Sequence, residues 1–143
     1  MNKPRNNIIW PESMRTGVDC MDEQHQTLAD MIRLADARLQ DNSSRDIDAV
    51  ILDLLSYALY HFDTEEELMR RYDYHFAERE KHCREHRRFS AAITQYQQEI
   101  NQGQSVSGSE LLGFVREWLT LHILITDKRL GKFLSGKIET SHD

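Results

Sequence analysis

Residues 47–72 read IDAVILDLLSYALYHFDTEEELMRRY, and the spacing of apolar residues in this stretch decides the fold. One set of residues recurs in steps of four and three: Ile47, Ile51, Leu54, Ala58, His61, Glu65, Leu68 and Tyr72. Because an α-helix turns once every 3.6 residues, this spacing places the whole set on one face of a helix. The otherwise apolar face carries His61 and Glu65, so the stretch predicts a buried polar group within a core helix.

Three further stretches repeat this helical spacing. The first contains Met21, His25, Leu28, Ile32, Ala35 and Leu39. Another contains His82, His86, Phe89, Ile93, Tyr96 and Ile100. The last contains Leu111, Val115, Trp118, His122, Ile125 and Phe133, and its start is marked by a capping box of Ser107 and Glu110. Four amphipathic segments of about 18 to 28 residues predict an all-α, antiparallel, up-down-up-down four-helix bundle.

The ends of the chain lack this spacing. Pro4, Pro11 and Gly17 interrupt residues 1–18, for which we expect an extended N-terminal arm. The bundle is expected over residues 19–136, with its last helix fraying near Gly131 or Gly136, and residues 137–143 are expected to form a C-terminal tail. The boundary between the second and third helices stays open, because residues 72–81 contain neither Pro nor Gly.

Composition excludes several classes of protein. A chain of 143 residues is long enough for one domain with one hydrophobic core. Its net charge of −6 argues against binding to nucleic acid or to anionic membranes. The most apolar stretch, residues 118–125, is far shorter than the roughly 20 residues of a membrane-spanning helix. With no secretory signal and no CxxC motif, Cys20 and Cys83 are expected to be free thiols in the cytoplasm.

Histidine or acidic residues interrupt all four predicted core faces. The set consists of His25, His61, Glu65, His82, His86, His122 and Asp127. A single buried histidine is most often only hydrogen-bonded within the core. Burying five imidazoles and two carboxylates together is costly without a compensating cation, so metal binding is the better interpretation of the set.

The donor types restrict the metal. Seven donors are too many for one tetrahedral zinc ion, and Ca²⁺ or Mg²⁺ would not select imidazole. Nitrogen donors mixed with carboxylates suit iron, manganese or another first-row ion, and two ions that share bridging carboxylates use every donor.

Two positions leave alternatives open. The five-residue step from His122 to Asp127 turns about 140° around an ideal helix, so Asp127 either reaches in from the side or is rotated by a π-bulge. His75 lies two turns before His82 and is a rival donor, although a solvent-facing role is favoured.

The order of these motifs resembles that of the hemerythrin family, in particular its single-domain bacterial members. The matching residues are Trp10, the segment 21–25 (MDEQH), HFxxEE at 61–66, HxxxH at 82–86 and WLxxHIxxxD at 118–127. The resemblance implies a non-heme di-iron centre with an oxo or hydroxo bridge. It assigns His82, His86 and His122 to one iron, and His25 and His61 to the other. By the same resemblance Glu65 and Asp127 bridge the irons, and O₂ binds at the open position of the two-histidine iron.

An apolar pocket is expected around that open position. Its candidate lining residues are Trp10, Leu28, Trp118, Leu119 and Ile123. The alternative for Trp10 is to anchor the N-terminal arm, and for the other four it is an ordinary core role. The histidine-rich donor set differs from the carboxylate-rich set of ferritin-like bundles, and this difference favours reversible O₂ capture over oxidation chemistry.

The leading hypothesis is therefore a protein that stores, delivers or senses O₂ and is not an enzyme. A sensing role would need a separate signalling or redox partner. The alternatives are a di-iron peroxidase or nitric-oxide-handling enzyme, and an iron-responsive interaction module that unfolds when it loses metal. The enzyme hypothesis is weakened because no general acid or base beyond the donors is evident on the core faces.

Overall fold

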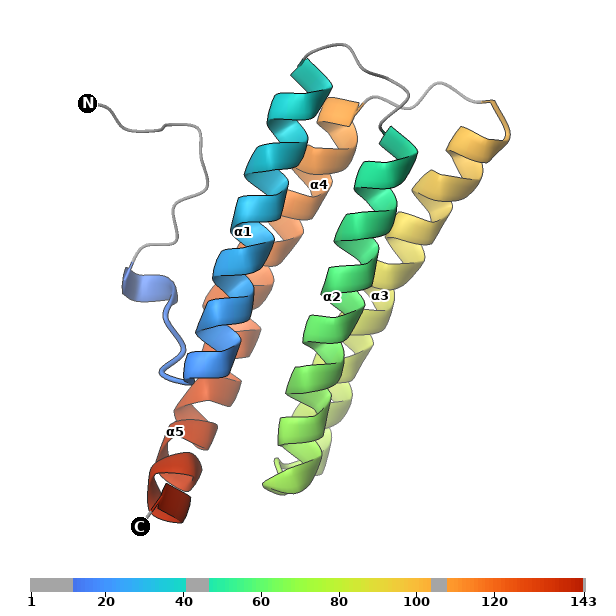
Figure 1. Ribbon diagram of the computed structural model, residues 1–143. Coiled ribbons are helices and arrows are strands. Elements are labelled where there is room, and N and C mark those ends of the chain that lie inside the picture. Colours follow the sequence, from blue (N-terminus) through green and yellow to red (C-terminus); the bar gives the residue numbers. More distant parts are fainter. Residues whose placement is uncertain (1–11, 41–46, 104–107, 143) are drawn as a thin grey trace, which may run out of the picture.

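Four long helices run antiparallel in up-down-up-down order in the computed structural model, which describes residues 12–40, 47–103 and 108–142 (Figure 1). They are α1 (Asp19–Gln40), α2 (Ile47–Arg71), α3 (Phe76–Asn101) and α4 (Gly108–Leu121). The last continues through a π-helical segment, η3 (His122–Asp127), into α5 (Lys128–His142). The all-α four-helix bundle predicted from the four core faces is confirmed. Ser107 and Trp10 lie outside the described residues, so the predicted capping box and the contacts of Trp10 are not seen.

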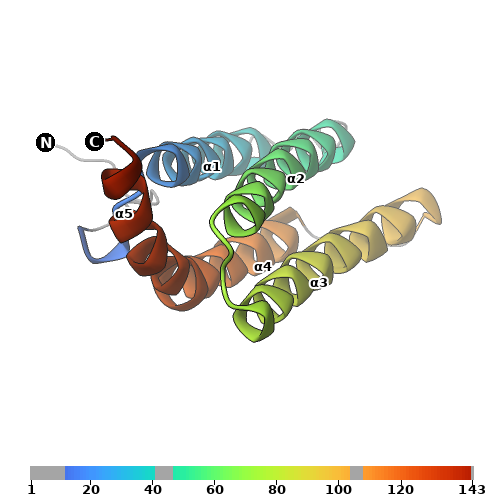
Figure 2. The same cartoon turned by 90° about the horizontal axis from the view of Figure 1, so that it is seen from below.

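Seen along its axis, the bundle places α1, α2, α3 and α4 at four corners, so that each helix turns one face inward (Figure 2). Two apolar clusters fill the space between the helices. The first includes Leu28, Ile32, Leu54, Phe62, Phe89, Val115, Leu119 and Ile123. The second lies towards α5 and includes Val18, Met21, Met69, Tyr74, Leu130 and Leu134. Along α1, His25 falls between Met21 of the second cluster and Leu28 of the first, so the polar residues occupy the level between two apolar ones.

The turn between α2 and α3 is a Schellman motif without glycine. The Tyr74 N–H donates to the Met69 carbonyl at 2.9 Å, and the Asp73 N–H donates to the Arg70 carbonyl at 3.4 Å. Asp73 adopts a positive φ of 58°, a conformation in which glycine is usual at this position and Asp is tolerated. Tyr74 and Met69 then pack together in the second apolar cluster. This motif sets the boundary that the sequence left open.

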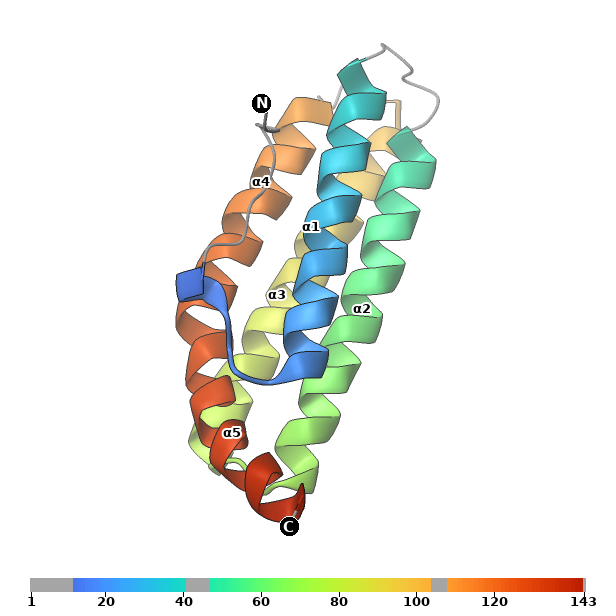
Figure 3. The same ribbon diagram turned by 60° about the vertical axis from the view of Figure 1, so that its left-hand side comes forward.

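The segment before α1 folds back against α5 (Figure 3). The carboxylate of Asp22, in the first turn of α1, fixes it by accepting hydrogen bonds from the backbone N–H and the hydroxyl of Thr16, both at 2.9 Å. Gly17 continues the turn at a φ of +91°. Residues 12–18 of the predicted arm therefore contain the short 3-10 helix η1 (Glu12–Met14) and a clamped turn.

The sequence predicted that the last helix frays near Gly131 or Gly136 and that residues 137–143 form a tail. Both predictions are wrong for the described residues, because α5 continues through the two glycines to His142. Gly131 is required for packing, because a Cβ atom there would lie 2.4 Å from the carbonyl oxygen of Thr16. A Cβ at Gly136 would meet no heavy atom within 4 Å, so that glycine neither ends the helix nor allows a close contact. None of the helices in the described ranges is long and apolar enough to cross a membrane.

Candidate metal centre

All seven predicted donor residues converge at the level between the two apolar clusters. They come from three of the long helices and from the π-helical continuation of the fourth: His25 from α1, His61 and Glu65 from α2, His82 and His86 from α3, and His122 and Asp127 from η3. Each is at most 4% exposed. Their ligand atoms form two groups that share both carboxylates, and within each group these atoms lie within 4.8 Å of one another.

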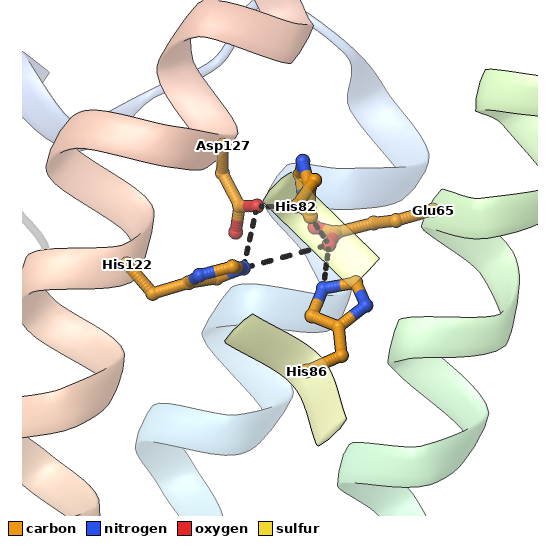
Figure 4. A group of neighbouring side chains, drawn as sticks. All are labelled: Glu65, His82, His86, His122 and Asp127. Atoms are coloured by element: carbon orange, nitrogen blue, oxygen red, sulfur yellow. Dashed lines mark hydrogen bonds and ion pairs between the residues drawn. The ribbon is translucent and has the colours of Figure 1, made fainter. Parts of the chain in front are cut away.

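The first group combines three imidazoles with both carboxylates (Figure 4). Glu65 Oε1 lies 3.1 Å from His82 Nε2 and 3.0 Å from His86 Nε2. Asp127 Oδ1 lies 3.1 Å from His82 Nε2 and 3.0 Å from His122 Nε2. The three Nε2 atoms therefore face one oxygen of each carboxylate, and we call this group the three-histidine position.

The second group combines two imidazoles with the same carboxylates. The other oxygen of Glu65, Oε2, lies 2.8 Å from His61 Nε2 and 3.5 Å from His25 Nε2. The other oxygen of Asp127, Oδ2, lies 2.8 Å from His25 Nε2. Each carboxylate thus turns one oxygen towards each group, which is the arrangement that two bridged metal ions require. We call this second group the two-histidine position.

The π-helical segment η3 brings Asp127 inward. The Lys128 N–H donates to the carbonyl of Ile123, five residues earlier, so the helical turn is widened by one residue. Both His122 and Asp127 are buried as a result. The widened turn also changes the outward face: Ile125, which the sequence placed on the core face, is 57% exposed. Of the two alternatives that the sequence left open for Asp127, the π-bulge is the one observed.

Only some of the inward-facing atoms hydrogen-bond to one another, as His25 does to Asp127. Among the described residues, His61 Nε2, Glu65 Oε2, His122 Nε2 and Asp127 Oδ1 are buried without a hydrogen bond of good geometry. Buried polar groups without partners are rare because each is costly. Close donor atoms that lack hydrogen bonds, at the meeting point of imidazoles and carboxylates, fit a pair of first-row metal ions.

Without a metal, protons balance the charge of the buried carboxylates. Burial alone lowers the pKa of His25 and of His82, but hydrogen bonds to Asp127 and Glu65 outweigh it and raise each pKa to about 9. Burial alone raises the pKa of Glu65, and the histidines outweigh it by charge and hydrogen bonds and hold that pKa well below its usual value. The site therefore retains imidazolium ions at neutral pH, and a bound cation would displace their protons.

Three imidazoles are oriented by a partner at their outer nitrogen, Nδ1. His86 Nδ1 lies 2.8 Å from Glu66 Oε2, and His122 Nδ1 lies 2.7 Å from Glu85 Oε1. Contact with these histidines lowers the pKa of Glu66 and lowers that of Glu85 to about 2, although burial opposes both shifts. For His61, the outer partner is a neutral amide: its Nδ1 lies 2.8 Å from Gln24 Oε1.

The sequence analysis missed all three outer partners. Each comes from a different helix than its histidine, so no spacing along one helix reveals the pair. The only available signal was chemical, because metal-binding histidines usually donate their second N–H to a carboxylate or carbonyl.

The predicted pocket-lining residues divide into two sets. Leu28, Leu119 and Ile123 are each 1% exposed and belong to the first apolar cluster. Trp118 stacks on the His122 ring with centroids 4.6 Å apart, and so lies beside the three-histidine position. Phe62 stacks in the same way on His86, at 4.0 Å.

A small pocket of about 90 Å³ reaches His25. Ile123 and Met14 line it together with Glu12, Arg15, Asp22 and Gln26, so it is more polar than the dry, apolar pocket predicted from the sequence.

His75 does not belong to either group of donors. Its side chain is exposed, and its ring lies beside Tyr74 and Phe133. Cys20 and Cys83 are free thiols, as predicted. Burial and the neighbouring Glu66 raise the pKa of Cys83 to about 11, which keeps this thiol protonated.

Comparison with known proteins agrees with this geometry. The hemerythrin HHE cation-binding domain matches residues 16–134. A bacteriohemerythrin of Pseudomonas paraeruginosa is 33% identical over 116 residues, which cover 81% of this chain and 74% of that protein. A bacteriohemerythrin of Methylococcus capsulatus is 32% identical over 125 residues, which cover 85% of this chain and 91% of that protein. A crystal structure of wild-type hemerythrin superimposes with a TM-score of 0.82 at 28% identity, covering 90% of this chain and 98% of that one. The chain belongs to the hemerythrin family.

Proposed function

We propose that this protein holds two iron ions at the three-histidine and two-histidine positions and binds O₂ reversibly at the second of them. His82, His86 and His122 would hold one iron, and His25 and His61 the other. Glu65 and Asp127 would bridge the two. When bound, the iron pair supplies the electrons that reversible O₂ binding needs.

One observation carries the proposal: the two positions share both carboxylates but offer unequal numbers of donor atoms. The three-histidine position offers five protein donors, and the two-histidine position offers four. With the same solvent-derived bridge on both sides, six-coordinate ions would leave one position open, on the side of His25 and His61. Membership of the hemerythrin family points to iron as the bound ion, and the nitrogen-rich donor set is of a kind that suits first-row metal ions such as iron.

The protein's own residues favour binding over further reaction. The first apolar cluster covers the site with Leu28, Leu119 and Ile123, which limits the access of water. Gln24 holds the His61 ring through a neutral hydrogen bond and places no additional acid or base there. A ligand at the two-histidine position therefore meets apolar side chains and a neutral amide within the bundle, and charged side chains only through the small pocket that reaches His25.

The test uses ferrous protein loaded without oxygen and then exposed to O₂. The expected result is a visible absorption band that disappears under vacuum and returns with O₂. We expect His61→Ala and His25→Ala to abolish the band, while His75→Ala, which changes an exposed histidine outside the site, retains it.

Two results would contradict the proposal. A band that persists in His61→Ala would show that O₂ binds elsewhere. Irreversible oxidation on first exposure, together with turnover of added peroxide, would instead indicate a di-iron enzyme.

A further inference from the structure

The two metal positions differ in the charge that surrounds their imidazoles. At the three-histidine position, two of the three outer nitrogens contact a carboxylate: His86 contacts Glu66, and His122 contacts Glu85. At the two-histidine position, the one outer partner is the neutral amide of Gln24. The outer nitrogens of His25 and His82 have no hydrogen-bond partner among the described residues.

A carboxylate at the outer nitrogen strengthens a histidine as a metal donor. It draws the Nδ1 proton towards itself, so that Nε2 on the other side of the ring becomes more electron-rich. Its negative charge also attracts the cation directly, within a buried region where screening is weak. An amide oxygen fixes the ring orientation in the same way but contributes no charge.

Both carboxylates are held in place by the fold. Glu85 reaches from α3 to His122 and also accepts a hydrogen bond from the hydroxyl of Thr126, at 2.8 Å. Glu66 reaches from α2 to His86 on α3. Their side chains are only 28% and 38% exposed, so solvent screens them less than it screens a surface ion pair. The neighbouring Glu67 pairs instead with Arg70 and Arg71 on the surface of α2.

We propose that Glu66 and Glu85 are positioning residues that make the three-histidine position the first to fill with a divalent first-row cation, ahead of the two-histidine position. This inference rests on the proposed function in requiring two metal positions. It goes further by assigning an order of filling and the residues that set the order. Loss of one such outer partner typically weakens metal binding 10- to 100-fold.

The test is a titration of the metal-free protein with Co²⁺, in competition with a chelator, at fixed pH and without O₂. We expect two equivalents to bind in two steps, and His61→Ala to retain the tighter step alone. Glu66→Gln and Glu85→Gln keep an oxygen acceptor at Nδ1 but remove the charge. Each is expected to weaken the tighter step by about tenfold or more. Glu67→Gln, with the same change in net charge next to Glu66, is expected to leave both steps unchanged.

The reverse substitution gives a second, independent test. Gln24→Glu adds a carboxylate at the outer nitrogen of His61 and is expected to tighten the weaker step by about tenfold, which narrows the gap between the steps. Substitutions that only disturbed packing would not weaken the tighter step in Glu66→Gln and Glu85→Gln and tighten the weaker step in Gln24→Glu. Circular dichroism of each metal-free variant checks that the bundle is retained.

The possible failures are distinguishable. If the wild-type chain binds fewer than two Co²⁺ ions, the two-metal function itself is wrong. If it binds two, but the tighter step is unchanged in both Glu66→Gln and Glu85→Gln, the assignment of these carboxylates is wrong. If Gln24→Glu weakens or leaves unchanged the second step, the role of outer charge is wrong.

Discussion

Replacing Gly131 with alanine tests the contact that ties the N-terminal segment to α5. A Cβ at position 131 would lie close to three atoms of Thr16: 2.4 Å from the carbonyl oxygen, 2.6 Å from the Cβ of Thr16 and 3.0 Å from its carbonyl carbon. Carbon atoms pack favourably at about 3.5–4.0 Å, so the backbone at Thr16 must move by roughly 1 Å. Thr16 cannot move freely, because its N–H and hydroxyl both donate to Asp22.

The size of the effect follows from two opposing terms. Alanine is favoured over glycine inside a helix by about 1 kcal/mol. Forcing additional atoms into a packed contact costs about 1–3 kcal/mol, and the strained hydrogen bonds to the Asp22 carboxylate add to that cost. We therefore expect Gly131→Ala to lower the free energy of unfolding by about 1–2 kcal/mol.

Gly136→Ala is the matched control, five residues further along the same helix. A Cβ there meets no heavy atom within 4 Å, so only the helix preference applies and we expect a gain of up to about 1 kcal/mol. Urea denaturation of the metal-free proteins, followed by circular dichroism, measures both changes. If Gly131→Ala were as stable as Gly136→Ala, the close approach of Thr16 to α5 would be wrong.

Two further predictions concern the metal-free protein and the turn before α3. The pKa of His25 and that of His82 are raised to about 9 in the folded state, from an unfolded value near 6.5. Protonation of these histidines therefore stabilises the fold fully below pH 6.5, and this contribution is lost as the pH rises through 9. We expect the free energy of unfolding of the metal-free protein to fall between pH 7 and pH 9.5 in urea titrations. We also expect metal binding at pH 7.5 to release protons, so that the heat of binding measured by calorimetry depends on the ionisation enthalpy of the buffer. A heat of binding that is independent of the buffer would contradict this expectation. Asp73→Gly relieves the positive φ of 58° and is expected to raise the free energy of unfolding by about 0.5–1 kcal/mol; a loss of stability in urea titrations would show that the Asp73 side chain itself stabilises the turn.

The sequence was sufficient for the fold and for the gathering of the seven donor residues because both depend on helical periodicity. His61 and Glu65 lie four residues apart, as do His82 and His86, so each pair shares a helical face. Once four such faces turn inward in a bundle, their polar residues meet at the same level. The π-bulge was one of two alternatives that the five-residue step from His122 to Asp127 left open, and the sequence alone did not choose between them.

Contacts between distant segments could not be predicted in this way. Gly131 looked like a helix end because glycine is unfavourable inside helices, and only packing against Thr16 explains why it lies within one. Nothing in the spacing along α2 links Glu66 to His86, yet the two side chains contact each other across the interface between α2 and α3. In both cases the deciding partner is on another segment, and helical periodicity alone does not tell which side chains of two segments meet.

The position of the site between two separate apolar clusters bears on how metal binding and folding are coupled. Each cluster joins residues from several helices and contains none of the seven donors, so most of the apolar burial is independent of the site. Without metal, imidazolium ions balance the charges of Glu65 and Asp127, so the net charge of the buried donor site stays close to zero. Metal uptake is then an exchange of protons for cations within a preformed bundle, in contrast to small zinc domains that fold only with their metal. Such an exchange allows the two positions to differ in affinity without a change in fold, and this difference can reside in residues as far out as Glu66 and Glu85.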